Sequence, residues 1–123
     1  MLVITVNDKN VEINPARFDD VCEAVWILTS LIPVGKVSSY GEIGRMLRVH
    51  PRLVANCLSR NRYPLIIPCH RVVYKDGRLG GYSDGGAMVK ARLLQVEGAL
   101  RGDENRVPVD AFIRLDEFFK SKR

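Results

Sequence analysis

Pro51, near the middle of the chain, separates two short helical patterns. Before it, Ser39 and Glu42 stand three residues apart in the arrangement of a capping box, which predicts the start of a helix. Pro51 itself is well placed to begin a second helix, which continues to Ser59. Two short helices joined by a brief turn are typical of a helix-turn-helix, although the periodicity fits a structural helical hairpin equally well.

Alternating apolar residues at the N-terminus predict a β-hairpin. Residues 2–6 and 11–13 have the pattern of strands, and the turn-forming residues 7–10 separate them. Asn14 before Pro15 predicts the N-cap of a helix that runs from about residue 18 to residue 32. The residues at the spacing of one buried face in this helix are Val21, Ala24, Val25 and Leu28.

The C-terminal half predicts one longer helix and one short amphipathic helix. The longer helix runs from about Ala87 to Glu97, with Gly98 as its stop and Val89, Leu93 and Leu94 as its apolar side. The short one spans residues 112–119. At 123 residues we expect a single domain (1–123), divided into a hairpin (1–16), a helical core (17–100) and a C-terminal tail (101–123). The expected fold class is mostly α with a small N-terminal β-hairpin, an α+β fold.

A thiol, an imidazole and a guanidinium group stand side by side in the segment Pro68-Cys69-His70-Arg71. A cysteine reacts as its thiolate, which a nearby cation or a helix N-terminus favours. His70 and Arg71 are candidate cations, and Pro68 suits the first position of a helical turn. The alternative is a buried strand in which Cys69 is a small hydrophobic residue. Both interpretations are compatible with the local sequence.

The basic residues favour an anionic partner, and nucleic acid is the obvious one. The formal net charge is +5, and Glu42 is the only acidic residue between positions 41 and 75. A solvated charged surface is the alternative. The N-terminus lacks the basic region of a secretory signal. Three cysteines without a C-x-x-C pair predict free thiols in a reducing compartment, with Cys22 and Cys57 as buried structural residues.

A glycine-rich segment follows the Pro68–Arg71 segment. Residues 75–86 hold five glycines, which predicts a mobile or tightly turning loop with exposed backbone N–H groups. The segment lacks the Gly-Lys-Ser/Thr ending of a phosphate loop. With only two histidines in the chain, a zinc site is poorly supported, and we expect no metal and no cofactor.

Five sequence blocks in this order resemble the C-terminal, active domain of the O6-alkylguanine-DNA alkyltransferases. The resemblance covers about residues 21–98, and its most specific block is Ile-Pro-Cys-His-Arg-Val. The other blocks begin at Gly35, at Arg52, at Gly80 and at Val89. The resemblance implies a winged-helix-like helix-turn-helix domain that repairs alkylated guanine by direct, single-turnover transfer of the alkyl group to a cysteine.

The resemblance also implies roles for individual residues. Cys69 would accept the alkyl group, His70 would relay its proton through a water, and Glu97 would polarise the imidazole. Tyr40 would donate a hydrogen bond to the guanine. The implied substrate-pocket residues are Asn61, Val72, Gly80, Tyr82 and Ser83. The implied DNA-binding residues are Arg52, which would fill the stack vacated by the flipped nucleotide, and Ala55, Asn56, Ser59 and Arg60, which would lie in the minor groove.

Three features depart from the family pattern. The N-terminal half of the family is reduced here to about 16 residues, Asn56 replaces a very small residue, and Asp84 is an apparent one-residue insertion. The main alternative is therefore an alkyltransferase-like protein, which binds the lesion without transfer and flags it to other repair machinery. Such proteins carry tryptophan or alanine where Cys69 stands. A plain helix-turn-helix regulator and a cysteine hydrolase are weaker alternatives.

The expected partner is double-stranded DNA that contains O6-alkylguanine. We expect a monomer, with several molecules able to bind along one DNA, and no association with a membrane. The expected location is cytoplasmic, at the nucleoid, or nuclear in a eukaryotic source.

Overall fold

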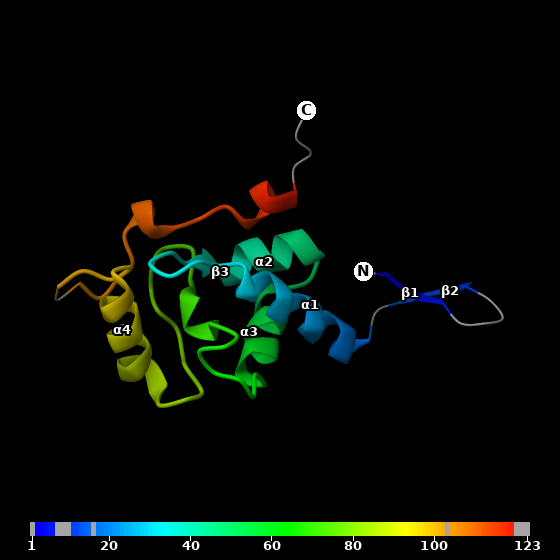
Figure 1. Ribbon diagram of the computed structural model, residues 1–123, viewed down its shortest axis with the longest axis horizontal. Helices are drawn as coiled ribbons and strands as arrows, with labels where there is room; N and C mark the ends of the chain where they lie inside the picture. The colour runs from blue at the N-terminus through cyan, green and yellow to red at the C-terminus, as the bar shows by residue number, and fades with distance from the viewer. Residues whose placement is uncertain (1, 7–10, 16, 103, 120–123) are drawn as a thin grey trace.

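The computed structural model describes residues 2–6, 11–15, 17–102 and 104–119 of the chain. Within this part, a body of four α-helices lies beside an N-terminal hairpin (Figure 1). The α-helices are α1 (Phe18–Ser30), α2 (Tyr40–Leu47), α3 (Pro51–Ser59) and α4 (Gly86–Glu97). Three short 3₁₀ helices are η1 (Cys69–Arg71), η2 (Val109–Ala111) and η3 (Leu115–Phe119). The predicted fold class, mostly α with an N-terminal hairpin, is confirmed.

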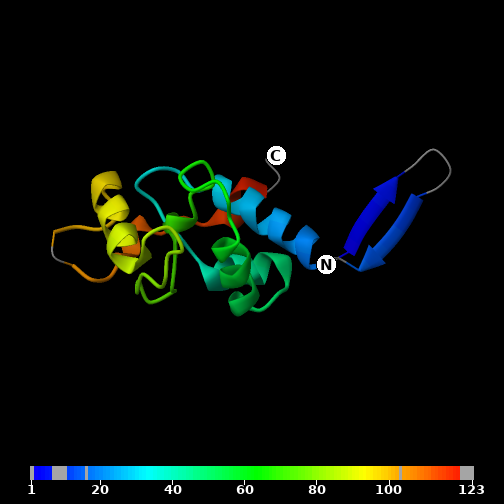
Figure 2. The same cartoon turned by 90° about the horizontal axis from the view of Figure 1, so that it is seen from below.

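Strands β1 (Leu2–Val6) and β2 (Val11–Pro15) form an antiparallel hairpin that extends away from the helical body (Figure 2). The predicted turn at residues 7–10 lies outside the described residues. The predicted helix cap at Asn14 is wrong, because Asn14 and Pro15 pair with β1 and are held in an extended conformation. Helix α1 begins at Phe18 instead, where the Arg17 N–H donates to Asp20 Oδ2 at 3.0 Å.

Helices α2 and α3 form the predicted helix-turn-helix. Ser39 Oγ accepts a hydrogen bond from the Glu42 N–H at 3.0 Å, as the capping pattern predicts. Pro51 is the first residue of α3, and Nδ1 of His50 accepts from the Arg52 N–H at 3.0 Å. The turn needs Gly44, because a Cβ atom there would lie 2.7 Å from the carbonyl oxygen of Val49. Local sequence signals therefore define both helices.

A two-residue parallel pairing joins the helix-turn-helix to the segment that contains Cys69. Strand β3 (Ser38–Ser39) pairs with strand β4 (Val72–Val73), which directly follows η1. Neither strand is predicted from the sequence, because two residues carry no readable period. This pairing brings the start of α2 beside the residues that follow Cys69, and both valines are fully buried.

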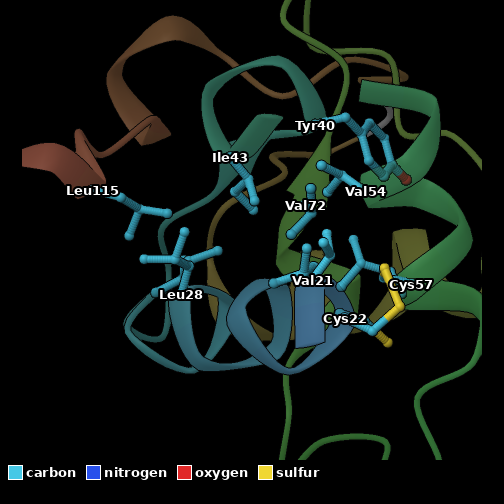
Figure 3. Packing of buried hydrophobic residues seen from close by; sticks show 13 residues of the cluster. Val21, Cys22, Leu28, Tyr40, Ile43, Val54, Cys57, Val72 and Leu115 are labelled. Atoms are coloured by element: carbon cyan, nitrogen blue, oxygen red, sulfur yellow. A yellow bond between two sulfur atoms is a disulfide. The ribbon is translucent and has the colours of Figure 1, made fainter. Parts of the chain in front are cut away.

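The main core lies between α1, α2 and α3 (Figure 3). The expected inward-facing residues Val21, Val25 and Leu28 of α1 are buried, whereas Ala24 is half-buried. The expectation of free thiols is wrong for Cys22 and Cys57, which form a disulfide between α1 and α3 with their Cα atoms 4.8 Å apart. The two helices pack closely enough at this point for the sulfur atoms to bond. Among the described cysteines, Cys69 alone is free.

Helix α4 ends at Gly98, which has a φ of +88° as its predicted role as a stop requires. Its buried side differs from the prediction, because Val89 is exposed and Lys90 is buried beside Leu94. The tail then returns across the body, where Val107, Ala111 and Leu115 are buried. The predicted helix at residues 112–119 is restricted to η3. In the described part of the chain, no helix is both long and apolar enough to cross a membrane.

Candidate functional site

Cys69 is the first residue of the 3₁₀ turn η1, and its side chain is buried. Pro68 precedes the turn rather than beginning it, and its carbonyl oxygen accepts from the Arg71 N–H at 2.9 Å. A turn of three residues is too short to act as the N-terminus of a helix with a substantial dipole. The electrostatic surroundings of the sulfur are therefore set by side chains.

Cys69 lies in the wall of a pocket of about 340 Å³. A volume of this size falls within the range of small-molecule sites. Of the residues implied by the family resemblance, the pocket is lined by Tyr40, Ala55, Ser59, Cys69, Tyr82 and Ser83. Leu58, Tyr74 and Gly81 complete the lining, and Leu58 and Tyr74 were not predicted. The aromatic side chains in this lining suit a planar ligand beside the thiol.

Asn61 fixes the loop behind the sulfur. Its Nδ2 lies 3.5 Å from Cys69 Sγ and donates to the Ile67 carbonyl at 3.0 Å. Its Oδ1 accepts from the Tyr63 N–H at 2.9 Å. The side chain is buried and does not line the pocket, so Asn61 supports the segment before Cys69 from behind.

A buried lysine that is not among the predicted site residues lies beside Tyr40. Nζ of Lys90 donates to Tyr40 Oη at 3.1 Å and to the carbonyl oxygens of Val72 at 2.7 Å and Gly81 at 3.2 Å. Burial lowers the pKa of Lys90 to about 8, against the opposing attraction of Cys69. Burial raises the pKa of Tyr40 to about 12, with further contributions from Tyr74 and Cys69. Tyr40 therefore keeps its proton, and the lysine donates to its oxygen.

His70 and Glu97 lie close together, as the family resemblance implies. Nε2 of His70 is 3.1 Å from Glu97 Oε1, although the two are not aligned as a regular hydrogen bond. Burial lowers the pKa of His70 below its ordinary value of 6.5, and the attraction of Glu97 only partly opposes this. The imidazole is therefore neutral at pH 7, and it is not the cation predicted from the sequence beside Cys69.

The second expected cation, Arg71, is paired with Glu97 instead of the sulfur. Its Nε and Nη2 donate to the two carboxylate oxygens at 3.0 and 2.7 Å. The buried cation Lys90 lies within electrostatic reach of the sulfur, since Cys69 raises the pKa of Lys90. A signal for it was present in the sequence, because a lysine at position 90 interrupts the apolar side of α4 next to Val89. Its burial became clear only from the packing.

Two expected pocket residues act through other groups. The Val72 side chain is fully buried, and its carbonyl oxygen accepts from Lys90, so Val72 is not part of the pocket lining. Gly80 has a φ of +75°, and a Cβ atom there would lie 3.0 Å from Tyr40 Oη and 3.2 Å from Tyr74 Cε2. Gly80 therefore leaves room for the ring of Tyr40 rather than contacting the pocket directly.

The expected DNA-binding residues lie on or near α3. Arg52 lines a second hollow of about 410 Å³, which shares Tyr40, Ala55 and Tyr74 with the cysteine pocket. Asn56 is exposed, and the Ser59 hydroxyl donates back to its carbonyl at 2.7 Å. Arg60 follows the end of α3, and its guanidinium lies 5.0 Å from the centre of the Phe18 ring. Arg52 therefore lies in a hollow that shares a wall with the pocket that contains Cys69.

Comparisons with known proteins agree on one family. Residues 20–99 match the family described as "6-O-methylguanine DNA methyltransferase, DNA binding domain". The methylated-DNA–protein-cysteine methyltransferase of Methanopyrus kandleri is 44% identical over 95 residues, which cover 70% of this chain and 71% of the relative. Several other curated methyltransferases are longer, and the matched region spans 40% of their length.

Two solved structures have a similar fold. OGT of Mycobacterium tuberculosis in complex with DNA has a TM-score of 0.60 and 38% identity, covering 63% of this chain and 48% of that one. Atl1 of S. pombe, in complex with damaged DNA that contains O6-carboxymethylguanine, has a TM-score of 0.69 and covers 80% of this chain and 98% of that one. Its identity of 23% supports similarity of fold alone.

Proposed function

Because the chain belongs to the family of the 6-O-methylguanine DNA methyltransferases, we propose that it repairs O6-alkylguanine in DNA by transferring the alkyl group to Cys69. The single observation that carries this proposal is the free thiol of Cys69 in the wall of a pocket lined by aromatic side chains. A guanine base inside a duplex cannot reach a buried thiol, so the damaged nucleotide has to be flipped out of the stack.

The transfer is a displacement at carbon. The sulfur of Cys69 forms a bond to the alkyl carbon while the bond from that carbon to O6 breaks, and the thiol proton passes to His70. His70 is suited to accept it, since its imidazole is neutral and buried. Its Nδ1 has no hydrogen-bond partner among the described residues, and a buried nitrogen of this kind is commonly satisfied by water, as a water relay requires. The thioether is not readily cleaved, so each molecule acts once.

Tyr40 would protonate the departing base. The guanine leaves with the electron pair of the broken bond, and a proton from the Tyr40 hydroxyl neutralises it. General-acid assistance of this kind contributes about 10²–10⁴-fold in typical enzymes. The raised pKa of Tyr40 makes a tyrosinate costly, but the adjacent Lys90 ammonium stabilises the negative charge that develops on its oxygen. Lys90 thus acts through Tyr40, as a positioning residue next to the proposed catalytic residues Cys69, His70, Glu97 and Tyr40.

Helix α3 would lie along the minor groove, with Arg52 entering the stack that the flipped nucleotide leaves. The hollow lined by Arg52 adjoins the cysteine pocket. This arrangement suits the proposed exchange, in which the flipped base enters the cysteine pocket and Arg52 takes the place of the base in the stack. Ala55, Asn56, Ser59 and Arg60 follow along the same helix and its end. Gly80 and Val72 would shape the base pocket indirectly, while Tyr82 and Ser83 would contact the base.

The partner we propose is duplex DNA that carries the lesion, bound by a monomer. We place the protein with the DNA, in the cytoplasm at the nucleoid or in the nucleus of a eukaryote. The Cys22–Cys57 disulfide is unusual for such a compartment, although intracellular disulfides are frequent in hyperthermophilic organisms.

The test is the mass of the peptide that contains Cys69 after incubation with duplex DNA. With O6-methylguanine in the duplex, we expect this peptide to gain one methyl group, and with unmodified guanine we expect no change. Cys69→Ser should abolish the gain and retain lesion binding. If Cys69 stays unmodified while the lesion is bound tightly, the protein is a lesion binder of the alkyltransferase-like class.

A further inference from the structure

Arg71 connects three separate parts of the fold. Its Nη1 donates to the Ile32 carbonyl at 2.8 Å, just beyond the end of α1. Its Nε and Nη2 donate to Oε1 and Oε2 of Glu97, the last residue of α4. Only 13% of the arginine side chain and 14% of the glutamate side chain are exposed. A planar guanidinium that engages both carboxylate oxygens fixes the plane of the carboxylate as well as its distance.

The same carboxylate oxygen faces the imidazole. Glu97 Oε1 lies 3.0 Å from Arg71 Nε and 3.1 Å from His70 Nε2. Glu97 is thus placed between a permanent cation and a titratable group, and its negative charge is shared between them. Burial raises the pKa of Glu97, but its close contacts with Arg71 and His70 outweigh this and hold the pKa below its ordinary value. The carboxylate remains ionised next to the histidine.

We propose that Arg71 is a positioning residue, which holds Glu97 against His70 and offsets its charge so that the imidazole remains a neutral proton acceptor for Cys69. The proposal deepens the proposed function and rests on it for the transfer step. In that step the proton moves from the sulfur to the imidazole, while Glu97 stays ionised and Arg71 keeps its proton. An imidazolium cannot accept a proton, so a carboxylate without its arginine would favour the wrong state of His70.

The charges that face His70 come from two elements. Glu97 and Lys90 lie on α4, Arg71 belongs to the same turn as the histidine, and the Tyr82 ring stands edge-on with its centre 6.4 Å away. Burial has the largest effect and lowers the pKa of His70, Glu97 raises it, and Arg71 and Lys90 lower it. Removing Arg71 takes away one lowering charge and also frees Glu97 to attract a proton to the imidazole. Both changes raise the pKa of His70.

Titration of the histidine ring protons by NMR tests this directly in the free protein. The chain contains only two histidines, and the exposed His50 serves as an internal reference. We expect Arg71→Met to raise the pKa of His70 by about one unit, a tenfold change in its protonation constant. Arg101→Met is the matched control, since Arg101 is exposed and pairs with Asp110, and it should leave His70 unchanged. An unshifted or lowered pKa of His70 in folded Arg71→Met would overturn the proposal.

The Arg71→Lys variant distinguishes the effect of the positive charge at position 71 from the effect of the bidentate contact with Glu97. It also provides a test if Arg71→Met does not fold. A lysine keeps the charge but cannot hold both carboxylate oxygens in one plane, so we expect a smaller shift of the His70 pKa in the same direction. A His70 pKa identical to that of the original protein in this variant would contradict the role of the bidentate contact.

The rate of methyl transfer as a function of pH is the functional readout. In Arg71→Met the acid side of the profile should move to higher pH by the same amount as the pKa of His70. A profile that stays in place while the NMR pKa moves would remove the proton-acceptor role of His70. If the protein with its original sequence transfers no methyl group at all, the proposed function fails. The NMR titration still decides whether Arg71 sets the charge state of His70.

Discussion

The ammonium group of Lys90 lies 3.1 Å from the hydroxyl oxygen of Tyr40, and both side chains are buried. The lysine comes from α4 and the tyrosine from the first turn of α2. The two residues are 50 positions apart in the sequence. This contact joins the cysteine pocket to a positive charge that three oxygen atoms hold in place.

We expect Lys90→Met to slow methyl transfer by at least about tenfold, because Tyr40 would lose the charge that stabilises its oxygen when it gives up a proton. Lesion binding should change much less. The measurement is the single-turnover rate of Cys69 methylation alongside the affinity for the damaged duplex. Lys36→Met is the control, since Lys36 is exposed and lies outside the pocket. Equal rates in the two variants would remove Lys90 from the mechanism.

The stability of the fold should rise with pH between about pH 8 and 10 because of Lys90. Its pKa is about 8 in the folded protein and 10.5 when unperturbed, so the unfolded chain binds more protons than the folded one in this window. The rise amounts to about 2 kcal/mol for a group shifted in this way. Above pH 10 the raised pKa of Tyr40 acts in the opposite direction. Urea unfolding at several pH values should show the rise, and Lys90→Met should lack it.

Gly80→Ala should distort the pocket without unfolding the protein. The added Cβ atom would meet Tyr40 Oη at 3.0 Å, and the φ of +75° is unfavourable for alanine, at a cost of about 1–2 kcal/mol. Gly81→Ala is the matched control, because a Cβ atom there meets nothing within 4 Å. Methylation rates and thermal unfolding of both variants check this expectation. Slower methylation by the Gly81→Ala variant, together with an unchanged methylation rate in the Gly80→Ala variant, would contradict this expectation.

Reduction of the Cys22–Cys57 disulfide should destabilise the protein. The bond closes a loop between residues 35 positions apart, which corresponds to about 3–4 kcal/mol in the chain-entropy account. The urea midpoint should fall on addition of a reductant, and the variant with Cys22→Ala and Cys57→Ala should show the lower midpoint without any effect of reductant. Thiol labelling of the unfolded protein checks the pairing: one cysteine should react before reduction and three after it.

Arg52→Ala should weaken capture of the lesion more than binding to undamaged DNA, because its side chain lines the hollow next to the cysteine pocket. Fluorescence of a base analogue opposite or beside the lesion would report the flipping step. Arg101→Ala serves as the control, because it removes one positive charge at an exposed position outside the pocket. Similar losses in both variants would reduce the role of Arg52 to general attraction for phosphates.

Much of the fold follows from short local signals. The Ser39 cap, the position of Pro51 at the start of α3 and the glycine that ends α4 each act within one turn of backbone, so they can be recognised without the tertiary structure. The N-cap at Asn14 failed for the opposite reason. Its cap signal competed with strand pairing, and the pairing with β1 prevailed. The parallel pairing of β3 with β4 was not predicted, because two residues have no period.

The candidate site divides in a similar way. The residue types of Pro68–Arg71 and the family blocks identify Cys69, His70, Glu97 and Tyr40 from the sequence. The partners of these groups depend on which helices pack together: α4 brings Lys90 to Tyr40, and it also brings Glu97 between His70 and Arg71. The sequence suggested that His70 and Arg71 would be cations beside the thiol. Burial neutralises the first, and the second is paired with a carboxylate.

The chain by itself therefore determines where helices begin and end and which side chains can react, because those properties reside in neighbouring residues. Tertiary structure decides the charge states of these side chains and the pairing of Cys22 with Cys57. Desolvation and contacts between distant segments set a pKa or form a disulfide, and both arise only once α1, α3 and α4 have packed around the segment that contains Cys69.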